Sequence, residues 1–544
     1  MSVEPRDPRD EPKGKFTTYL GVILLAVAFL GSLAISVRNT FRVERPSKPV
    51  ILVAHWQLEA GYREALQGVI DEYNKQHPDT EVRQVPLAEK VYAQWLNVQL
   101  FAGTAPDICE MGKANLATKD EYTVKYYVPL SNYIGQPNPY NAGTDLEHVP
   151  WKETLLDGMR TGFREGLQEY YGVSTTIYGM RLFYNKDLLR RATGSDAPAR
   201  TFDEWLAQLD AVRAYGQKSN ADLLPLVSSY GMDVLYNQYH APIMSPFEPD
   251  VDLDLDGRMT TVETYIAYRR GIARLDDPQI KSLFERLRSL GERMQQGYSS
   301  LDRQQAMFRF VNGQVGYMFT GSWDASGTFV QAKEKGFDVG VCEVPLLDGR
   351  EPGRRVNEAA GSGGGLYGVY KDSKNVDRAV DFLQYLTSQK VNEKFNQASQ
   401  WPPITIGAEP SELMRPFAPN PVGYAAYLQY GFGPLATQEL YGNLVNYYQG
   451  DEPFEKVVGA YDAAILDPKF GGDDAWANEF VERQRDVRSK EALLAQHAAL
   501  ELIKPGSVDA DRYRSALLQQ ASRNDGLDYA YLFQKYRGKE LKEP

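Results

Sequence analysis

The stretch that decides the fold is Phe310-Val-Asn-Gly-Gln-Val-Gly-Tyr-Met-Phe-Thr-Gly-Ser-Trp-Asp324. It predicts the end of an amphipathic helix, a tight turn at Asn312-Gly313, a short buried strand and a loop that begins at Gly321. The glycine allows a sharp turn after the strand, so Trp323 stands at the carboxyl end of the strand beside Asp324. An indole next to a carboxylate suits a sugar, whose C–H face stacks on the ring while its hydroxyls need acceptors. The alternative is that Trp323 is half-buried packing.

Length and composition set the class of protein. A chain of 544 residues is too long for one ordinary core, so we expect two or more domains. Its 43% hydrophobic and 24% charged residues are typical of a globular protein. A net charge of −12, without a basic stripe, argues against a nucleic-acid partner. With five histidines, the sequence contains no HExxH motif and no GxSxG elbow, so we predict that the protein is not an enzyme.

The periodicity is that of an α/β protein. Leu66, Val69, Ile70 and Tyr73 fall on one helical face, and a short strand follows at residues 82–85. Strands that alternate with helices predict mostly parallel sheets covered on both sides.

The N-terminal segment decides the compartment. Residues 16–37 carry no charge, and 22 helical residues span about 30 Å, the thickness of a hydrocarbon core. We predict a cytoplasmic segment at 1–15, a transmembrane anchor at 16–37 and a linker at 38–49. A cleaved signal peptide is the alternative, although Ser32-Leu33-Ala34 is not a clean cleavage site. Basic residues on both sides of the segment leave its orientation open.

Residues 252–263 match the calcium-loop pattern D-x-D-x-D-G-x5-E at every defining position. Gly257 supplies the sharp turn, and a helix is predicted to leave the loop at 262–273. Pro246 and Pro249 argue against a helix that enters it, so we predict an EF-hand-like loop and not a full hand. The expected Ca²⁺ ligands are carboxylates of Asp252, Asp254, Asp256 and Glu263, the carbonyl of Arg258, and Thr260 directly or through water. A solvated acidic turn is the alternative; bound calcium would be structural.

Five segments resemble, in the same order, the bacterial extracellular solute-binding proteins of the sugar-binding type, the relatives of maltose-binding protein. They are 50–62 with His55-Trp56-Gln57-Leu58-Glu59, 102–111 with Ala-Gly-Thr-Ala-Pro-Asp-Ile, 184–205, 310–324, and the pair 336–345 and 363–388. Each segment alone is weak. Their common order over roughly residues 50–405 makes the resemblance strong.

The resemblance implies an α/β protein with two lobes joined by hinge strands, which is a type II-like periplasmic-binding-protein fold. The solute-binding domain would span 50–470. One lobe would combine about 50–170 with 338–395, and the other about 180–335 with 396–470. Residues 471–544 would form a helical C-terminal extension that departs from the family.

The ligand would lie between the lobes, at the carboxyl ends of strands. The glycines at 363–365 would let backbone approach it, although a glycine run is also typical of a hinge or turn. The ligand-binding residues that the loop positions and the resemblance nominate are His55, Trp56, Gln57, Glu59, Glu110, Met111, Tyr178, Tyr230, Trp323, Asp324 and Gly364.

The resemblance implies a carbohydrate-binding component of an ABC importer, with permease subunits as partners. The body would lie on the periplasmic or extracellular side of the bacterial inner membrane, held by one membrane pass. Two alternatives stay open: a ligand-sensing receptor that is not coupled to transport, and a glycosidase built on Glu59 and Glu110. Cys109 and Cys342 lie in predicted strands, and the sequence leaves open whether they pair.

Overall fold

The computed structural model describes most of the chain between residues 48 and 466. The described residues are 48–58, 61–112, 120–164, 167, 169–228, 233–252, 259, 261–294, 298, 303–345, 358, 363–420, 423, 430–432, 434–450 and 452–466. The predicted membrane segment 16–37 and the predicted extension 471–544 lie outside these ranges. Among the described residues, no helix is long and apolar enough to cross a bilayer.

By its internal contacts the chain divides into two units. The described residues of the first unit are 48–50 and 77–81, and the second holds the remainder. The fold below is that of the second unit, apart from the first residues of β1 and β2.

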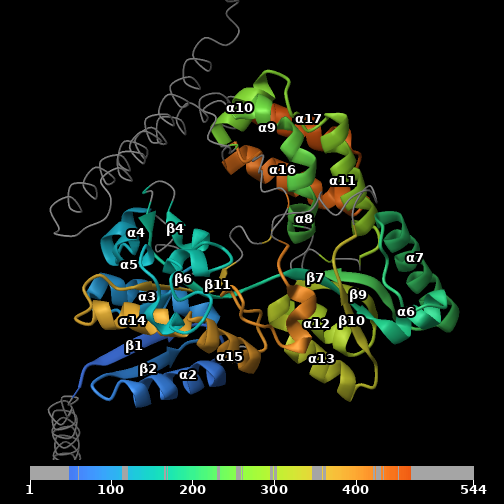
Figure 1. The fold of residues 1–544 in the computed structure, drawn as a ribbon. Coiled ribbons are helices and arrows are strands. Elements are labelled where there is room, and N and C mark those ends of the chain that lie inside the picture. Colours follow the sequence, from blue (N-terminus) through green and yellow to red (C-terminus); the bar gives the residue numbers. More distant parts are fainter. Residues whose placement is uncertain are drawn as a thin grey trace, which may run out of the picture. The chain divides into compact units, whose positions relative to one another are not determined.

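One sheet has five strands in the order β2-β1-β3-β11-β6 (Figure 1). Their bounds are β1 Val50–His55, β2 Glu81–Pro86, β3 Ile108–Glu110, β6 Val173–Ile177 and β11 Gly363–Val369. The helices packed with this sheet are α2 Tyr62–Gln76, α3 Glu89–Ala102, α14 Val376–Leu386 and α15 Gln389–Ser399. The predicted face of α2 is confirmed, because Leu66, Val69, Ile70 and Tyr73 are all buried.

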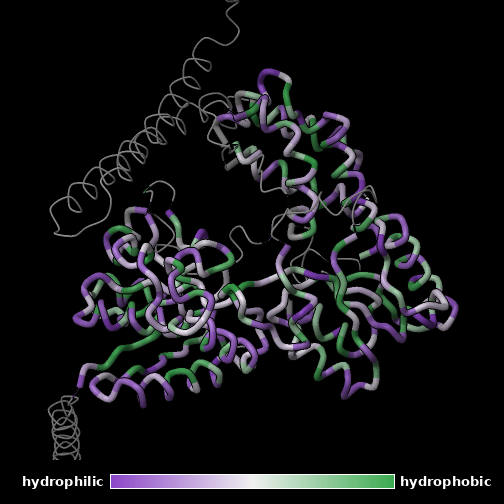
Figure 2. The backbone as a smooth tube through the Cα atoms, viewed as in Figure 1, coloured by the Kyte–Doolittle hydropathy of each residue, from purple (hydrophilic) through white to green (hydrophobic). Residues whose placement is uncertain are grey.

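A second sheet has four strands in the order β10-β7-β9-β8. Their bounds are β7 Met180–Asn185, β8 Leu224–Ser228, β9 Val315–Gly321 and β10 Val339–Cys342. Around it lie α6 Lys186–Thr193, α7 Phe202–Ser219, α12 Arg303–Val311 and α13 Ala325–Glu334. Figure 2 shows mainly hydrophobic strands and helices along which hydrophilic and hydrophobic stretches alternate.

In the stretch 310–324 the predicted helix end, the turn at Asn312-Gly313 and the buried strand are confirmed, whereas Gly321 is the last residue of the strand rather than the first of the loop. Helix α12 ends at Val311, Gly313 adopts a positive φ of 75°, and all seven residues of β9 are buried. A 3-10 turn at Ser322–Asp324 follows the strand. These features could be predicted because a helix end, a turn and a fully buried strand each depend on residues that are neighbours in the sequence.

The expectation of mostly parallel sheets is wrong. Of the strand pairs with a described register, β1–β3 and β8–β9 are parallel. In contrast, β11 is antiparallel to β3 and β6, β7 is antiparallel to β9 and β10, and the small pair β4–β5 is antiparallel. The reason is topological: β11 and β7 are entered from the other sheet rather than through a helix beside the same sheet, so the right-handed βαβ crossover does not apply to them.

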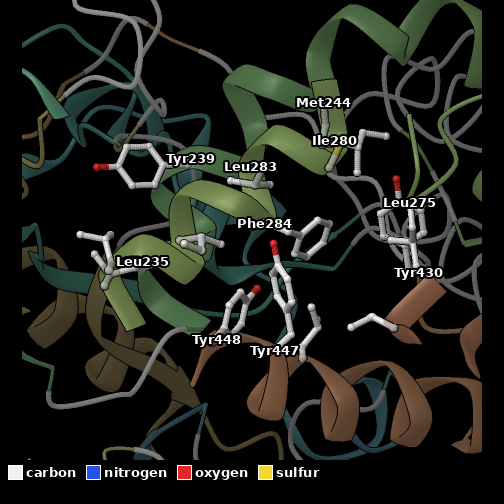
Figure 3. Packing of buried hydrophobic residues seen from close by; sticks show 14 of the residues in the cluster. Leu235, Tyr239, Met244, Leu275, Ile280, Leu283, Phe284, Tyr430, Tyr447 and Tyr448 are labelled. Atoms are coloured by element: carbon white, nitrogen blue, oxygen red, sulfur yellow. The ribbon is translucent and has the colours of Figure 1, made fainter. Parts of the chain in front are cut away.

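Helices rich in tyrosine pack with the second sheet. They are α8 Asp233–Met244, α9 Glu248–Val251, α10 Thr261–Arg269, α11 Pro278–Gly291, α16 Pro434–Tyr448 and α17 Phe454–Leu466. Figure 3 shows Phe284 of α11 packed near Tyr447 and Tyr448 of α16. The remaining elements are α4 Asp120–Tyr126, α5 Ser131–Ile134, β4 Phe163–Arg164, β5 Glu169–Tyr170, and 3-10 helices at Pro139–Asn141, Trp151–Thr154, Arg160–Gly162, Ser245–Phe247 and Glu412–Phe417.

The chain passes three times between the two sheets. The first connection, from β6 to β7, contains only Tyr178 and Gly179. The second runs from β10 to β11, and the third follows residue 404, because Ile404 packs in the core of the first sheet and Met414 in that of the second. The boundaries therefore differ from the predicted ones: β10 still belongs to the second sheet, and residues up to 404 still belong with the first.

Both cysteines are free thiols. Cys109 lies in β3 of the first sheet and Cys342 in β10 of the second. Burial raises the pKa of both thiols, that of Cys342 to about 12. The two side chains therefore remain protonated at neutral pH and behave as small hydrophobes.

Candidate functional site

The carboxyl ends of β1 and β3 hold the first group of predicted site residues. The strands are parallel, with Ala54 opposite Cys109, so the chain leaves both at the same edge of the sheet. Glu110 of β3 joins them: one carboxylate oxygen accepts from the backbone N–H of Trp56 at 3.0 Å and the other from the Gln57 side chain at 2.5 Å. Tyr92 donates to the Glu110 carbonyl at 2.9 Å.

This group is mostly turned inward. His55, Gln57, Glu110 and Met111 are all buried. Nε2 of His55 lies 3.0 Å from the side-chain oxygen of Gln84, and burial lowers the pKa of the imidazole, which is therefore neutral at pH 7. The backbone of Met111 donates to Leu366 at 2.7 Å. The role of these residues as ligand contacts stays a prediction, because their described hydrogen bonds are to other protein groups and hold the loop after β1 in place.

Trp56 is the member of this group that presents a ring. It is half-buried and packs edge-on against Tyr92, with centroids 5.1 Å apart. Leu58, which follows Gln57, is 48% exposed, so the loop turns toward the surface after Gln57. Glu59, also predicted here, lies outside the described residues.

The indole of Trp323 lies against the backbone of Gly321. A Cβ atom on Gly321 would stand only 2.4 Å from carbons of the indole. The glycine has φ −96° and ψ 169°, which any residue adopts, so the sharp turn that we expected it to provide is not its role. Gly321 is required because only a bare Cα leaves room for the ring.

A second group of site residues surrounds this indole. Tyr178 contacts Trp323 edge-on, with centroids 5.5 Å apart, and both rings are half-buried. Gly364 of β11 pairs with Thr176, and a Cβ there would lie 3.4 Å from Trp401 and 3.7 Å from Tyr178. The glycine run is thus part of a strand rather than a loose turn. Sequence reasoning missed Trp401, whose only signal was an aromatic residue before Pro402-Pro403.

Two further predicted residues have other surroundings. Asp324 is buried, and its carboxylate accepts a hydrogen bond from Thr320 at 2.6 Å. This bond closes the turn after β9, so the carboxylate points to the strand. Tyr230 lies outside the described residues.

The predicted calcium loop is described only at its two ends. Asp252 and Glu263 are buried, whereas Asp254, Asp256, Arg258 and Thr260 lie outside the described residues. Burial, and then the charge of Asp252, raises the pKa of Glu248. Within the described ranges, no group of three acidic, His or Cys side chains is placed to hold a metal ion.

The expectation that no helix enters this loop is wrong. Helix α9 ends at Val251, directly before Asp252, and α10 begins at Thr261. Pro249 stands in the first turn of α9, where its missing N–H costs nothing. The prolines therefore start short helical pieces instead of preventing them.

Two sheets covered by helices and joined by three connections form the two-lobe fold of solute-binding proteins, and solved structures of this class are similar to the chain in fold. The GacH receptor of Streptomyces glaucescens GLA.O, solved unliganded and with acarbose, has a TM-score of 0.54 at 16% identity over 77% of this chain and 98% of that one. RafE of Streptococcus pneumoniae has a TM-score of 0.52 at 17% identity, covering 77% and 97%. Maltose-bound MalE3 of T. maritima also reaches 0.52 at 17% identity, covering 76% and 98%.

The family model for bacterial extracellular solute-binding proteins matches residues 68–416, and the chain belongs to this family. No curated protein matches the chain. The resemblance predicted from the sequence is confirmed. The family and its structural relatives are binding proteins, which also confirms the prediction that the chain is not an enzyme.

Proposed function

We propose that this protein is the binding component of an ABC-type importer and that its ligand is a carbohydrate. The observation that carries the proposal is the Trp323–Tyr178 pair, in which two half-buried rings meet at the carboxyl end of β9 and the start of β7. Sugars bind to such faces through their C–H groups. The acarbose complex of GacH and the maltose complex of MalE3 support the same ligand class.

In the proposed mechanism, the sugar contacts both lobes and favours a closed state that the permease subunits recognise. The ligand shifts the population because it makes contacts in the closed state that are absent when the lobes are open. The half-buried Trp56, Tyr178 and Trp323 would supply apolar faces, and Trp401, which is buried in the core of the first sheet, would support them. The inward-bonded Glu110 and Asp324 would keep the surrounding loops in place.

Trp323→Ala should weaken sugar binding by about 1–3 kcal/mol while leaving the fold intact, because the ring is only half-buried. The sugar is first found by a thermal-shift screen of mono- and oligosaccharides that includes maltose and acarbose. Affinity is then measured by calorimetry.

Gly321→Ala is the positional control for that variant. Its methyl group displaces the indole without removing it, so binding should also weaken, whereas Gly327→Ala, with only the Gln331 side chain at 3.8 Å nearby, should bind normally. Unchanged affinity in Trp323→Ala together with a lowered melting temperature would mean that the ring is only packing.

We propose that residues 16–37 anchor the protein in the inner membrane with the binding domain outside. The length and apolarity of the segment support this. Full-length protein should fractionate with membranes and resist carbonate extraction, whereas a chain that starts near Lys48 should be released. A mature N-terminus near Ile35, found by N-terminal sequencing, would identify a cleaved signal peptide instead.

We also propose a structural Ca²⁺ in the loop 252–263. The sequence pattern supports it, and so do the two helices α9 and α10 that flank the loop and the burial of the carboxylates of Asp252 and Glu263. Calcium would neutralise carboxylates that otherwise repel one another.

A further inference from the structure

Arg181 of β7 lies next to the connections between the sheets, and its side chain is fully hydrogen-bonded. It is 2% exposed, and each of its five N–H groups has an acceptor. Nε donates to the carbonyl of Pro416 at 2.9 Å, and the terminal nitrogens donate to Met180 and Ala418, both at 2.8 Å, and to Glu358 at 2.5 and 3.0 Å. Such a fork holds its partners in a fixed plane.

Glu358 is the acidic partner of Arg181 and also bonds to Asn420. It binds Arg181 through both carboxylate oxygens, and its side chain is 13% exposed. One of these oxygens also accepts the backbone N–H of Asn420 at 2.9 Å, and the Glu358 N–H donates to the Asn420 carbonyl at 2.8 Å. Glu358 is therefore bonded to Arg181 and Asn420 together.

The residues that Arg181 bonds lie in or next to all three connections. Met180 follows the first, Glu358 lies in the second, and Pro416 and Ala418 belong to the third, where Asn420 is held through Glu358. The Phe417 carbonyl also approaches Gly179 so closely that a Cβ there would lie 3.0 Å away. One buried guanidinium thus links three segments that are far apart in the sequence.

We propose that Arg181 and Glu358 form a latch that fixes the second and third connections to the base of β7. With the latch made, Glu358 and residues 416–420 move together with the four-stranded sheet. Bending is then left to the residues between the latch and the five-stranded sheet, of which Tyr178-Gly179 and the residues between Ile404 and Met414 are described. The latch limits the open state to a narrow range of arrangements, as a hinge of a few residues does.

The proposal rests on the proposed function for its purpose, but its test needs no sugar. Full-length protein is spin-labelled at cysteines introduced at the exposed Gln94 of α3 and Lys333 of α13. The native thiols react slowly because burial raises the pKa of both. Double electron–electron resonance then gives the distribution of distances between the sheets, and hydrogen exchange reports on the Asn420 amide.

Arg181→Met should broaden the distance distribution and speed exchange at Asn420 by about tenfold or more, as expected for a lost charged hydrogen bond. The matched control is Arg274→Met, which breaks the Arg274–Asp462 ion pair among the helices of one lobe, and it should leave both readouts unchanged. An unchanged distribution in Arg181→Met, or equal broadening in the control, would overturn the latch.

Glu358→Gln keeps the test decisive if Arg181→Met does not fold. It removes the charge but retains one acceptor, so smaller changes of the same sign are expected, and no change at all would refute the proposal. If no sugar binds in the screen, the proposed function fails, but the distance and exchange measurements still test the latch. If a sugar binds and the distance distribution of the latch variants is unchanged, only the latch is refuted.

Discussion

Glu110→Gln is expected to lower the free energy of unfolding by about 2–4 kcal/mol. The carboxylate is fully buried, and each of its oxygens accepts one donor, from Trp56 and from Gln57. A glutamine offers one oxygen and places its NH₂ group against the other donor. The loss combines a charged hydrogen bond with a buried donor that has no acceptor, each worth roughly 1–3 kcal/mol.

Chemical denaturation of the full-length variant measures this loss. Glu153→Gln, at an exposed glutamate in the same lobe, is the matched control and should change stability by no more than about 0.5 kcal/mol. The loop after β1 should also lose its position, so sugar affinity should fall in Glu110→Gln. Equal stability of the two variants would show that Glu110 does not hold the loop.

Removal of calcium should lower the melting temperature. Asp252, Asp254, Asp256 and Glu263 bring four negative charges to one loop, and a cation bound only to the folded state stabilises it by about 2.7 kcal/mol at a hundredfold excess over its dissociation constant. Chelation should remove this contribution. Calcium should restore it better than magnesium, which gives up its water reluctantly.

Glu263→Gln should abolish most of the response to calcium while sugar affinity stays the same, because the site is proposed to be structural. Glu334→Gln, at an exposed position on α13, should respond as the unmodified protein does. If neither ion changes the melting temperature, the motif is an acidic turn. Loss of sugar binding on chelation, below the melting temperature, would instead place the ion in the binding mechanism.

The parts of the fold that the sequence predicted are the local ones. The run from Phe310 to Asp324 and the buried face of α2 were predictable because their signals lie within one element. The meeting of the loops after β1 and β3 was predictable because parallel neighbours end at the same edge. The antiparallel position of β11 was not, since it depends on which sheet a strand enters after a long connection.

The chemistry of single site residues was less predictable for a physical reason. A carboxylate at the end of a strand looks the same in sequence whether it faces outward or bonds inward. Asp324 bonds to Thr320 four residues earlier, and Glu110 bonds to a loop 54 residues away. The partner of Gly321 is the ring two residues ahead, a contact that depends on a side-chain rotamer and that no backbone propensity encodes.

The order of strands in the two sheets has a consequence for biosynthesis. All four strands of the second sheet lie between residues 180 and 342, so that sheet can assemble as soon as this part of the chain is made. In the first sheet, β11 stands between β3 and β6, and it begins only at Gly363. Until then β3 has an open edge, the kind of surface to which other chains add strands. We therefore expect the sheet that is begun first to be completed last, and nascent or truncated chains that stop before residue 363 to be the species most in need of a chaperone.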